Sequence, residues 1–477
     1  MTMEDTPTVR ALLEVEDEAS ELLLETVPGT DALLWPLVRW PLARALSEEG
    51  LNVTSVPRKR PSRPKALVQH ALGMVPTPVS SDRLREPVEH LFIVSGTTRV
   101  ETLGGVGNWL TDSYATALDE RAAVVQDAPL RYGGPRSERP LVARTWSFSR
   151  ALRRVDQRTR LEPLAAKELS QFDSIMADML APFSRQLSER LRSRVHTQVV
   201  YRVNRLPHVA REFRGLLERT RPRRIYMQTA AYGDRSNLIR IAHERGIEVA
   251  ELQHGWIGAS HAAYNFGAVM RRPELLACLP DTLLTFGEYW GEEVRFPGRV
   301  IPVGKPSLEE AARVAVPYEK RPPRVLVVSS IMERERLISV TQSLRRQLPD
   351  HWQVVFRPHP SERATVNELY AALLDDGVEV DVQSEVNSSI SNSKAVIGMV
   401  STVLYEALAF GVHIGVIETD LADHYSSAKM FPDRISDDSS LALFANRIAS
   451  GDAPHSTPEA RVWQSESVGS FQSFARN

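Results

Sequence analysis

WQVVFRPHPSERATVNELYAALLDDGVEV, residues 352–380, is the stretch that decides the fold. It begins with an apolar, β-branched run that predicts a buried strand, and after two prolines it continues into a segment with helical periodicity. Thr365 and Glu368 have the spacing of a capping box, so we expect the helix to begin there and to end at Gly377. The run VEV that follows reads as another strand. Strand, helix and strand in this order predict parallel neighbours in one sheet.

The same alternation extends in both directions along the chain. The runs with strand character around the quoted stretch are RVLVVSS, AVIGM and VHIGVIE, and those earlier in the chain are EHLFIVSG, RAAVVQDA, RRIYMQ, IEVAEL and DTLLTFG. We therefore expect an α/β fold with two Rossmann-like, doubly wound domains that face each other across a cleft. The predicted boundaries are 1–87 for N-terminal helices and a linker, 88–298 for a first domain with a helical insert at 161–217, and 299–477 for a second domain.

Composition limits the classes of function. The chain has 477 residues, 42% of them hydrophobic, with a net charge of -2 and a pI near 6.7, so no global basic field favours nucleic acid as a partner. The single cysteine, Cys278, excludes an intramolecular disulfide framework and any zinc site built from several cysteines. No apolar run approaches the ~20 residues of a spanning helix, and the acidic N-terminus lacks the pattern of a signal peptide. We expect a cytoplasmic protein.

The N-terminal region leaves two interpretations open. Aromatic and cationic side chains mix in its second helical stretch: Trp35, Arg39, Trp40 and Arg44. The basic, proline-rich segment PRKRPSRPK, residues 57–65, follows as a linker. One interpretation is a peripheral contact with anionic lipid at the inner face of the membrane. The other is a helix packed on the body with a solvated tether, which we favour because Pro36 and Pro41 should interrupt a membrane-binding helix.

Two motifs of the second series lie where ligands bind in open parallel sheets, at the carboxyl ends of strands. One is RPHP, in which Pro358 and Pro360 hold His359 rigidly, so that the imidazole could donate to a phosphate oxygen and Arg357 could pair with the same charge. The other is the pair Ser401 and Thr402 at the start of a helix, which offers hydroxyls and backbone N–H groups to an anion. The alternative is that these residues only satisfy loops and cap a helix.

Two further side chains of this region are open in role. Glu406 lies on the helix that Ser401 begins, and it either reaches the ribose of a donor or faces solvent. Lys305, in VGKP, could meet the phosphate, but we expect a solvated lysine near the hinge.

Three motifs together resemble a known group: LQHG after a strand of the first domain, RPHP after a strand of the second, and the Ser/Thr pair some forty positions later. The combination looks like the bacterial surface-polysaccharide transferases of GT-B fold. These include capsule Kdo transferases, sialyl- and polysialyltransferases that use CMP-sugars, and teichoic-acid glycerophosphotransferases that use CDP-glycerol. The resemblance covers residues 223–418, and its most specific part is YGDRSNLIRIAHERGIEVAELQHG, residues 232–255.

The resemblance implies roles for particular residues. It implies that His359, Pro360, Ser401 and Thr402 contact the nucleotide phosphates. It also implies an acceptor-facing side in the first domain, to which we assign Gln253, His254, Gly255 and Arg235. The chain departs from the sialyltransferase pattern because no acidic-acidic-glycine motif stands at the expected place: GEEV and DDG have the letters in another context. CMP-sialic acid is correspondingly disfavoured as the donor.

A base must take the proton of the attacking hydroxyl in an inverting transfer. His254 is the first candidate, because an imidazole titrates near neutrality and this one follows a strand. Asp234 is the second candidate, with capping of the next helix as its alternative role, and Asp112 in NWLTDSY is the third. No His/Asp cluster has the spacing of metal ligands and no DxD stands in a suitable loop, so we expect no metal and no cofactor.

The sequence therefore predicts an inverting, metal-independent glycosyltransferase. It would move a sugar from a CMP-linked or another nucleotide-activated donor to a surface or capsular glycan, or to a lipid-linked acceptor. Three alternatives remain open: a CDP-glycerol-type polyol-phosphate transferase, a nucleotide-sugar 2-epimerase, and a non-catalytic GT-B-like protein of envelope assembly.

Overall fold

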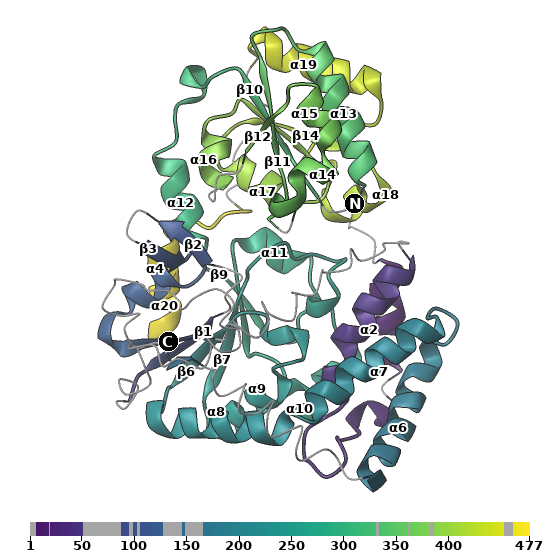
Figure 1. The fold of residues 1–477 in the computed structure, drawn as a ribbon. Helices are drawn as coiled ribbons and strands as arrows, with labels where there is room; N and C mark the ends of the chain where they lie inside the picture. The colour runs from purple at the N-terminus through teal and green to yellow at the C-terminus, as the bar shows by residue number, and fades with distance from the viewer. Residues whose placement is uncertain are drawn as a thin grey trace, which may run out of the picture. The chain divides into compact units, whose positions relative to one another are not determined.

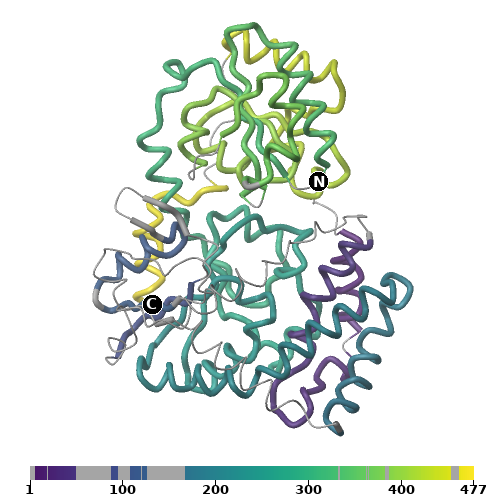
Figure 2. The backbone as a smooth tube through the Cα atoms, in the orientation of Figure 1, coloured from purple at the N-terminus to yellow at the C-terminus, as the bar shows by residue number. Residues whose placement is uncertain are grey.

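The computed structural model describes residues 6–18, 20–50, 87–94, 99–102, 105–126, 146–147, 166–330, 333–360, 362–381, 386–452 and 461–477. The chain divides into two compact units. The first domain consists of residues 5–285, 294–301 and 474–477, and the second consists chiefly of residues 286–293 and 302–473. Each has a central sheet with helices around it (Figures 1 and 2). The predicted fold class, α/β with two Rossmann-like domains, is confirmed.

The sheet of the first domain has seven strands in the order β5-β4-β1-β6-β7-β8-β9. Their bounds are β1 (His90–Val94), β4 (Ala122–Gln126), β5 (Trp146–Ser147), β6 (Arg224–Met227), β7 (Glu248–Leu252), β8 (Thr282–Thr285) and β9 (Arg299–Pro302). All neighbours from β5 to β8 are parallel. A separate antiparallel pair, β2 (Arg99–Thr102) and β3 (Gly105–Asn108), lies between β1 and β4 in the sequence. The direction of winding reverses between β1 and β6, which makes this the switch point of the sheet.

The predicted helical insert consists of three helices, α6 (Ala166–Leu180), α7 (Glu189–Val203) and α8 (Leu206–Thr220). Buried residues recur along α8 at helical spacing, and Phe213, Leu216 and Leu217 join the core beneath β1, β4, β6 and β7. The other helices of this domain are α1 (Pro7–Asp17), α2 (Trp35–Gly50), α4 (Asp112–Ala117), α9 (Ser236–His243) and α10 (Pro273–Leu276).

The sheet of the second domain has six parallel strands in the order β12-β11-β10-β13-β14-β15. Their bounds are β10 (Arg324–Val328), β11 (Gln353–Arg357), β12 (Glu379–Val380), β13 (Ala395–Gly398), β14 (His413–Ile417) and β15 (Arg434–Ile435). The chain winds outward from β10 to β12 and then returns to the other side of β10 as β13. The switch point of this sheet therefore lies between β10 and β13.

The second domain also contains a set of helices. Their bounds are α11 (Glu288–Glu292), α12 (Pro306–Arg313), α13 (Arg334–Gln347), α14 (Val366–Leu369), α15 (Ala371–Asp375), α16 (Val386–Ser391), α17 (Thr402–Leu408), α18 (Asp420–Tyr425), α19 (Asp438–Ser450) and α20 (Ser467–Arg476), whose last residues belong to the first domain. Val325 and Val327 of β10 point into a core shared with α13, α15 and α19. The residue between them, Leu326, faces α16 on the opposite side, as the period of two in a strand requires.

Two local predictions about helices were wrong. The side chain of Thr365 makes no capping hydrogen bond to α14. Its hydroxyl donates instead to the carbonyl of Glu362, next to the 3₁₀ turn that precedes α14. The expected helix is accordingly split into α14 and α15. Proline also fails to interrupt α2, which runs through Pro41. Pro41 has no N–H for the carbonyl of Leu37, and the guanidinium of Arg202 from α7 donates to that carbonyl instead, at 3.0 Å.

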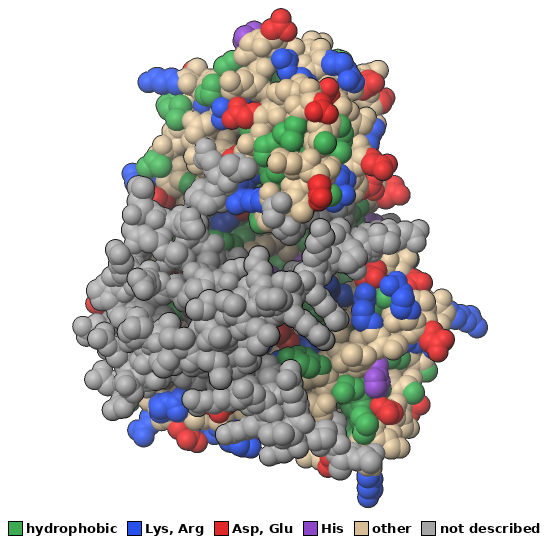
Figure 3. All heavy atoms as spheres, viewed as in Figure 1, with side chains coloured by type: hydrophobic (Ala, Val, Ile, Leu, Met, Phe, Trp, Pro, Cys, Tyr) green, Lys and Arg blue, Asp and Glu red, His purple; other side chains and the backbone are tan. Residues whose placement is uncertain are grey.

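The N-terminal helices belong to the first domain. Trp35 and Arg39 are buried, with 0% and 4% of their surface exposed, so the packed interpretation of this helix is the correct one for these residues. The linker at residues 57–65 lies outside the described residues. No helix in the described part of the chain is long and apolar enough to cross a membrane. On the face in Figure 3, cationic and anionic side chains are interspersed over the described surface of both domains.

Candidate functional site

The carboxyl edge of the second sheet brings together the two motifs that the sequence singled out. RPHP follows β11 and Ser401 follows β13, and both strands are neighbours of β10. Ser329 and Ser330 follow β10 itself, so hydroxyls stand on both sides of the switch point. This is the position at which open parallel sheets bind their ligands.

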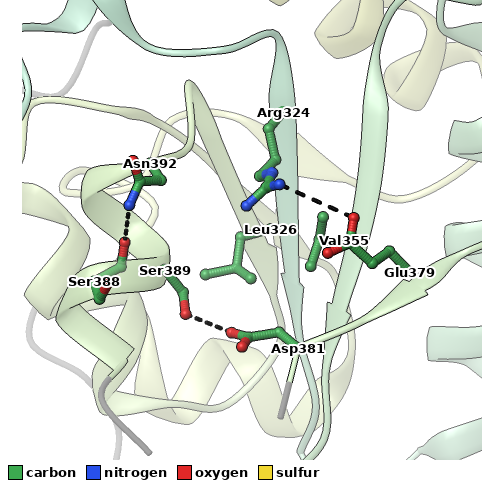
Figure 4. Close-up of a pocket in the computed structure, with 8 residues that line it drawn as sticks. All are labelled: Arg324, Leu326, Val355, Glu379, Asp381, Ser388, Ser389 and Asn392. Carbon is green, nitrogen blue, oxygen red and sulfur yellow. Dashed lines mark hydrogen bonds and ion pairs between the residues drawn. The ribbon is translucent and has the colours of Figure 1, made fainter. Parts of the chain in front are cut away.

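Arg357 is buried and forms hydrogen bonds within the second domain. Only 7% of it is exposed, and its Nη1 donates to Asp381 Oδ2 at 2.6 Å and to Ser389 Oγ at 3.1 Å. Ser389 in turn donates to Asp381, and Figure 4 shows these two side chains pointing toward each other from α16 and the end of β12. The small pocket in that figure lies against α16, with Arg324 reaching toward Glu379. We predicted that Arg357 pairs with a phosphate. In the structure its guanidinium already forms an ion pair with the carboxylate of Asp381.

His359 and Pro360 are exposed at the tip of the loop. The carbonyl of His359 accepts a hydrogen bond from the N–H of Glu362 at 2.8 Å, which closes the turn after the prolines. Partial burial lowers the pKa of His359, and Arg363 lowers it further, against an opposing effect of Glu362. A lowered pKa favours the neutral imidazole, which donates one N–H.

Ser401 is the N-cap of α17, as predicted: its Oγ accepts from the N–H of Val403 at 3.2 Å. Ser401 and Thr402 are both partly exposed.

Lys305 and Glu406 are both buried, so the expectation of a solvated Lys305 is wrong and Glu406 does not face solvent. Lys305 Nζ donates to Glu406 Oε1 at 2.6 Å, and the exposed fractions of the two side chains are 8% and 9%. The ammonium also lies over the rings of Phe286 and Trp463, 5.5 and 6.0 Å from their centroids. Glu406 Oε2 is buried and has no hydrogen-bond partner in the described part of the chain. A polar atom in that state is costly unless a ligand satisfies it.

A buried network behind β10 was missed by the sequence analysis. Ser329 Oγ donates to Glu362 Oε2 at 2.9 Å, and Tyr370 OH donates to the same oxygen at 2.9 Å. Arg334 pairs with the other oxygen of Glu362 at 2.9 Å. The network fixes the loop that carries RPHP, since Glu362 stands two positions after Pro360 along the chain.

His254, the first candidate base, follows β7 in the first domain. Burial lowers its pKa to about 4, and the nearby charge of Arg235 lowers it further. The expectation that this imidazole titrates near neutrality is therefore wrong, because a desolvated ring resists protonation. Gln253 is buried and donates to the carbonyl of Gly255 at 2.9 Å, which shapes the loop around the histidine. A Cβ on Gly255 would meet no atom within 4 Å, so open space adjoins this loop.

A cluster of aromatic rings and imidazoles surrounds His254. Tyr232 OH lies 3.1 Å from His261 Nε2 and 3.5 Å from His254 Nε2. Trp40 of α2 packs edge-on against Tyr232, with 4.4 Å between ring centroids, and stacks on His261 with an interplanar angle of 8°. Trp256 stacks on His261 from the loop after β7. The sequence analysis included Tyr232 only as the first residue of the segment 232–255 and missed His261, although both lie within thirty residues of LQHG.

A buried carboxylate completes this cluster. Glu251 in β7 is 0% exposed; its Oε1 accepts from Tyr264 OH at 2.6 Å and its Oε2 accepts from the N–H of Ala231 at 2.7 Å. Desolvation raises the pKa of Glu251 to about 7, although these hydrogen bonds and Arg235 oppose the shift. Burial also raises the pKa of Tyr264 well above its usual value.

The N-terminal helices hold the loop that carries His261. Glu16 of α1 accepts from Arg39 Nε at 2.6 Å and from the N–H of Gly267 at 2.9 Å. Arg39 also donates to the carbonyls of Ala262 and Asn265. These buried, charge-assisted bonds fix both α2 and the loop, and hence the approach of Trp40 to His261.

The two aspartates proposed as bases have other surroundings. Asp234 is exposed, and no side-chain bond from it caps α9, whose N-cap is Arg235. Burial lowers the pKa of Arg202, and the negative charge of Asp234 opposes that shift. Asp112 Oδ2 accepts from the N–H of Asn108 at 2.8 Å and so closes the turn between β3 and α4.

Arg235 is buried beside Glu251 and His254. Among the described residues, no group of three acidic, histidine or cysteine side chains could hold a metal ion.

No protein-family model matches the chain, and no curated protein matches it significantly. Several solved structures are similar in backbone. The UDP-GlcNAc 2-epimerase of Methanocaldococcus jannaschii has a TM-score of 0.44 at 10% identity, over 81% of this chain and 98% of that one. A ugt transferase from Siraitia grosvenorii, in complex with UDP, has a TM-score of 0.43 at 12% identity, over 82% and 99%. Phytolacca americana UGT2, complexed with UDP-2fluoro-glucose and pterostilbene, has a TM-score of 0.41 at 10% identity, over 82% and 94%.

Proposed function

We propose that this protein is an inverting, metal-independent glycosyltransferase that moves a sugar from a nucleotide-activated donor to a surface-glycan or lipid-linked acceptor. One observation carries the proposal: the RPHP loop and the Ser401–Thr402 pair follow the two strands that flank β10, next to the switch point of the second sheet. Together with the resemblance of LQHG, RPHP and the Ser/Thr pair to the surface-polysaccharide transferases, this arrangement favours a nucleotide site over a structural edge.

The second domain supplies the groups for a donor. The exposed His359 donates an N–H to a phosphate oxygen, and the hydroxyls of Ser401 and Thr402 donate two more bonds. Glu406 Oε2 is an acceptor for the ribose hydroxyls, because it lacks a partner while Lys305 balances the charge of the carboxylate. We leave Arg357 out of this donor site, because its Nη1 is held by Asp381 at 2.6 Å.

The first domain supplies the base. His254 is neutral at pH 7 because burial lowers the pKa of its ring to about 4, so it enters the reaction with a lone pair available. The acceptor hydroxyl gives its proton to this imidazole as its oxygen attacks the anomeric carbon. The nucleotide phosphate leaves as this bond forms, and hydrogen-bond donors stabilise its charge.

The test is an incubation of the purified chain with CMP-, CDP-, UDP- and GDP-linked sugars and with CDP-glycerol. Release of free nucleotide in the presence of a glycan acceptor supports the transferase, and release from CDP-glycerol alone identifies the polyol-phosphate alternative. An epimerase instead changes the sugar while the nucleotide stays attached. Thermal-shift measurements with the free nucleotides run in parallel, since a ligand at ~100 times its Kd adds about 2.7 kcal/mol of apparent stability. If no nucleotide stabilises the protein and none is released, the proposal fails.

A further inference from the structure

Three rings of the first domain lie in nearly parallel planes around the loop after β7. Trp40 of α2 and Trp256 of the loop both stack on His261, with 5.8 and 6.0 Å between ring centroids and interplanar angles of 8° and 27°. All three side chains are partly exposed. We call these three residues the aromatic platform. It lies next to the carboxyl end of a parallel strand, which is where open α/β sheets bind their ligands.

The loop that carries the platform is built to hold its shape. Asn265 Nδ2 donates to the carbonyl of Gly258 at 2.8 Å and to that of His261 at 3.0 Å, and Arg39 of α2 donates to the carbonyl of Asn265 itself. Because residue 258 is a glycine, the indole of Trp256 lies directly against it: a Cβ there would come 2.6 Å from Cζ2. The rings are therefore aligned before any ligand arrives, which reduces the entropic cost of binding.

A buried hydrogen-bonding atom lies close to the platform. His254 Nδ1 has no hydrogen-bond partner among the residues that the structure describes. The hydroxyl of Tyr232 lies 3.5 Å from Nε2 of this histidine and 3.1 Å from His261 Nε2, so the ring adjoins the platform. A Cβ on the neighbouring Gly255 would meet no atom within 4 Å, which leaves open space there. A hydroxyl group of a ligand both donates and accepts, so it satisfies Nδ1 in either tautomer of the ring.

The imidazoles of this cluster are uncharged. Burial lowers the pKa of His254 to about 4 and that of His261 to about 3, so both are neutral at pH 7. The guanidinium of Arg235, which acts on His254, belongs to a residue that is only 7% exposed. Arg44, one turn after Trp40 on α2, and Asp234 are exposed and have opposite signs. These surroundings favour an uncharged ligand over an anionic polymer.

We propose that the aromatic platform binds an uncharged sugar ring of the acceptor, with a hydroxyl of that sugar hydrogen-bonded to His254 Nδ1. The C–H groups on the face of a pyranose pack flat on an indole, whereas its hydroxyls project from the rim toward polar groups. The inference rests on the proposed function and names the acceptor class within it: a neutral glycan. Because Trp40 comes from α2, the N-terminal helices form part of the acceptor site.

The first experiment measures the binding of sugars without a donor. Saturation-transfer NMR and tryptophan fluorescence of the full chain are recorded with cellohexaose, maltohexaose and chitohexaose, and with a glycerol-phosphate polymer as the anionic probe. We expect at least one neutral oligosaccharide to bind and the glycerol-phosphate polymer not to bind. Binding of the anionic polymer alone, or of none of the four probes, would overturn the inference.

The second experiment repeats the titration with variants of the platform. Trp256→Ala should weaken oligosaccharide binding roughly 10-fold, because it removes a stacking face. Gly258→Ala keeps the indole but displaces it, so it should also weaken binding, and it covers the case in which Trp256→Ala does not fold. Tyr201→Ala removes an aromatic ring of α7 that is 55% exposed and outside the platform, and this matched control should bind as the native chain does. Native affinity in both platform variants would refute the sugar site.

These measurements separate the sugar site from the transferase. Oligosaccharide binding that depends on Trp256, without release of nucleotide from any donor, supports the sugar site and refutes the transferase. Nucleotide release with an unchanged KM for the glycan acceptor in Trp256→Ala refutes the sugar site and leaves the transferase standing. A KM raised roughly 10-fold in this variant, with kcat little changed, supports both.

Discussion

Replacing Gly233 by alanine should loosen α2 from the histidine cluster. Gly233 follows Tyr232, has a φ of +85°, and lies directly beneath the carbonyl of Pro36 in α2. A Cβ at this position would come 1.8 Å from the carbonyl oxygen and 2.9 Å from the carbonyl carbon of Pro36. Carbon and carbonyl oxygen meet at roughly 3.3 Å in folded proteins, so the helix must move away.

Two costs add for this substitution. An alanine in the left-handed region costs about 1 to 2 kcal/mol of backbone strain. Displacing a packed helix by an added methyl group costs about 1 to 3 kcal/mol more. Gly246 separates the two terms, because it also has a positive φ, +66°, while a Cβ there meets nothing within 4 Å. Gly246→Ala should therefore show the backbone term alone.

Differential scanning calorimetry of the full chain measures the difference. We expect Tm to fall by about 10 °C in Gly233→Ala and by about 3 °C in Gly246→Ala, at roughly 2 to 4 °C per kcal/mol for a unit of this size. Gly233→Ala should also slow turnover, because Trp40 withdraws with α2 from Tyr232 and His261. Equal losses of Tm in the two variants would show that the contact with Pro36 is not tight and would refute the reasoning.

Further predictions concern the donor groups and the titrating residues. His359→Ala should weaken nucleotide binding roughly 10-fold in calorimetry, since a bond to a charged partner contributes about 1.5 kcal/mol, whereas the exposed His351→Ala should change nothing; equal affinities would remove the phosphate role. Lys305→Met should destabilise the second domain by about 3 to 5 kcal/mol in urea unfolding, because it leaves Glu406 buried and unpaired. Lys305→Met with Glu406→Leu should recover most of that loss, and a double variant as unstable as the single one would contradict this account. Burial lowers the pKa of three histidines of the first domain, to about 4, 4 and 3: His90, His254 and His261. Their unfolded forms bind protons below about 6.5 while the folded forms do not, so each favours unfolding as the pH falls from 6.5 toward 4. The pKa of Glu251 is raised to about 7, so in this window the folded state holds one proton that the unfolded state lacks. This proton stabilises the folded state and offsets the effect of one histidine. The free energy of unfolding should therefore fall by roughly 2 kcal/mol per pH unit in this window, and a flat dependence between pH 6 and 5 would contradict the burial of these rings.

Local pattern was enough to place the strands and the loops between them. The runs predicted as strands correspond to β1, β4, β6, β7 and β8 in the first domain and to β10–β14 in the second. The reason is that burial in a parallel sheet requires short β-branched runs, which neighbouring residues specify by themselves. The same reasoning put RPHP and Ser401 at strand ends, because a strand end is a local feature.

Local rules failed where a distant residue supplied the partner. Pro41 should have ended a helix, but Arg202, 161 positions later in the chain, replaces its missing hydrogen bond. Lys305 should have been solvated, but Glu406 and the surrounding rings bury it. A side chain's partner depends on which elements pack together, and periodicity carries no information about that.

By itself, the sequence determined two parallel α/β series, the proline-framed histidine between a strand and a helix, and the absence of any cysteine-rich or DxD metal pattern. Only the tertiary structure decided which groups meet. It turned Arg357 inward to Asp381, lowered the pKa of His254 by burial, and assembled that ring with Trp40, Tyr232 and His261. The physical reason is that strands and turns arise from interactions between near neighbours, whereas desolvation and hydrogen-bond direction depend on atoms that the fold brings from far along the chain.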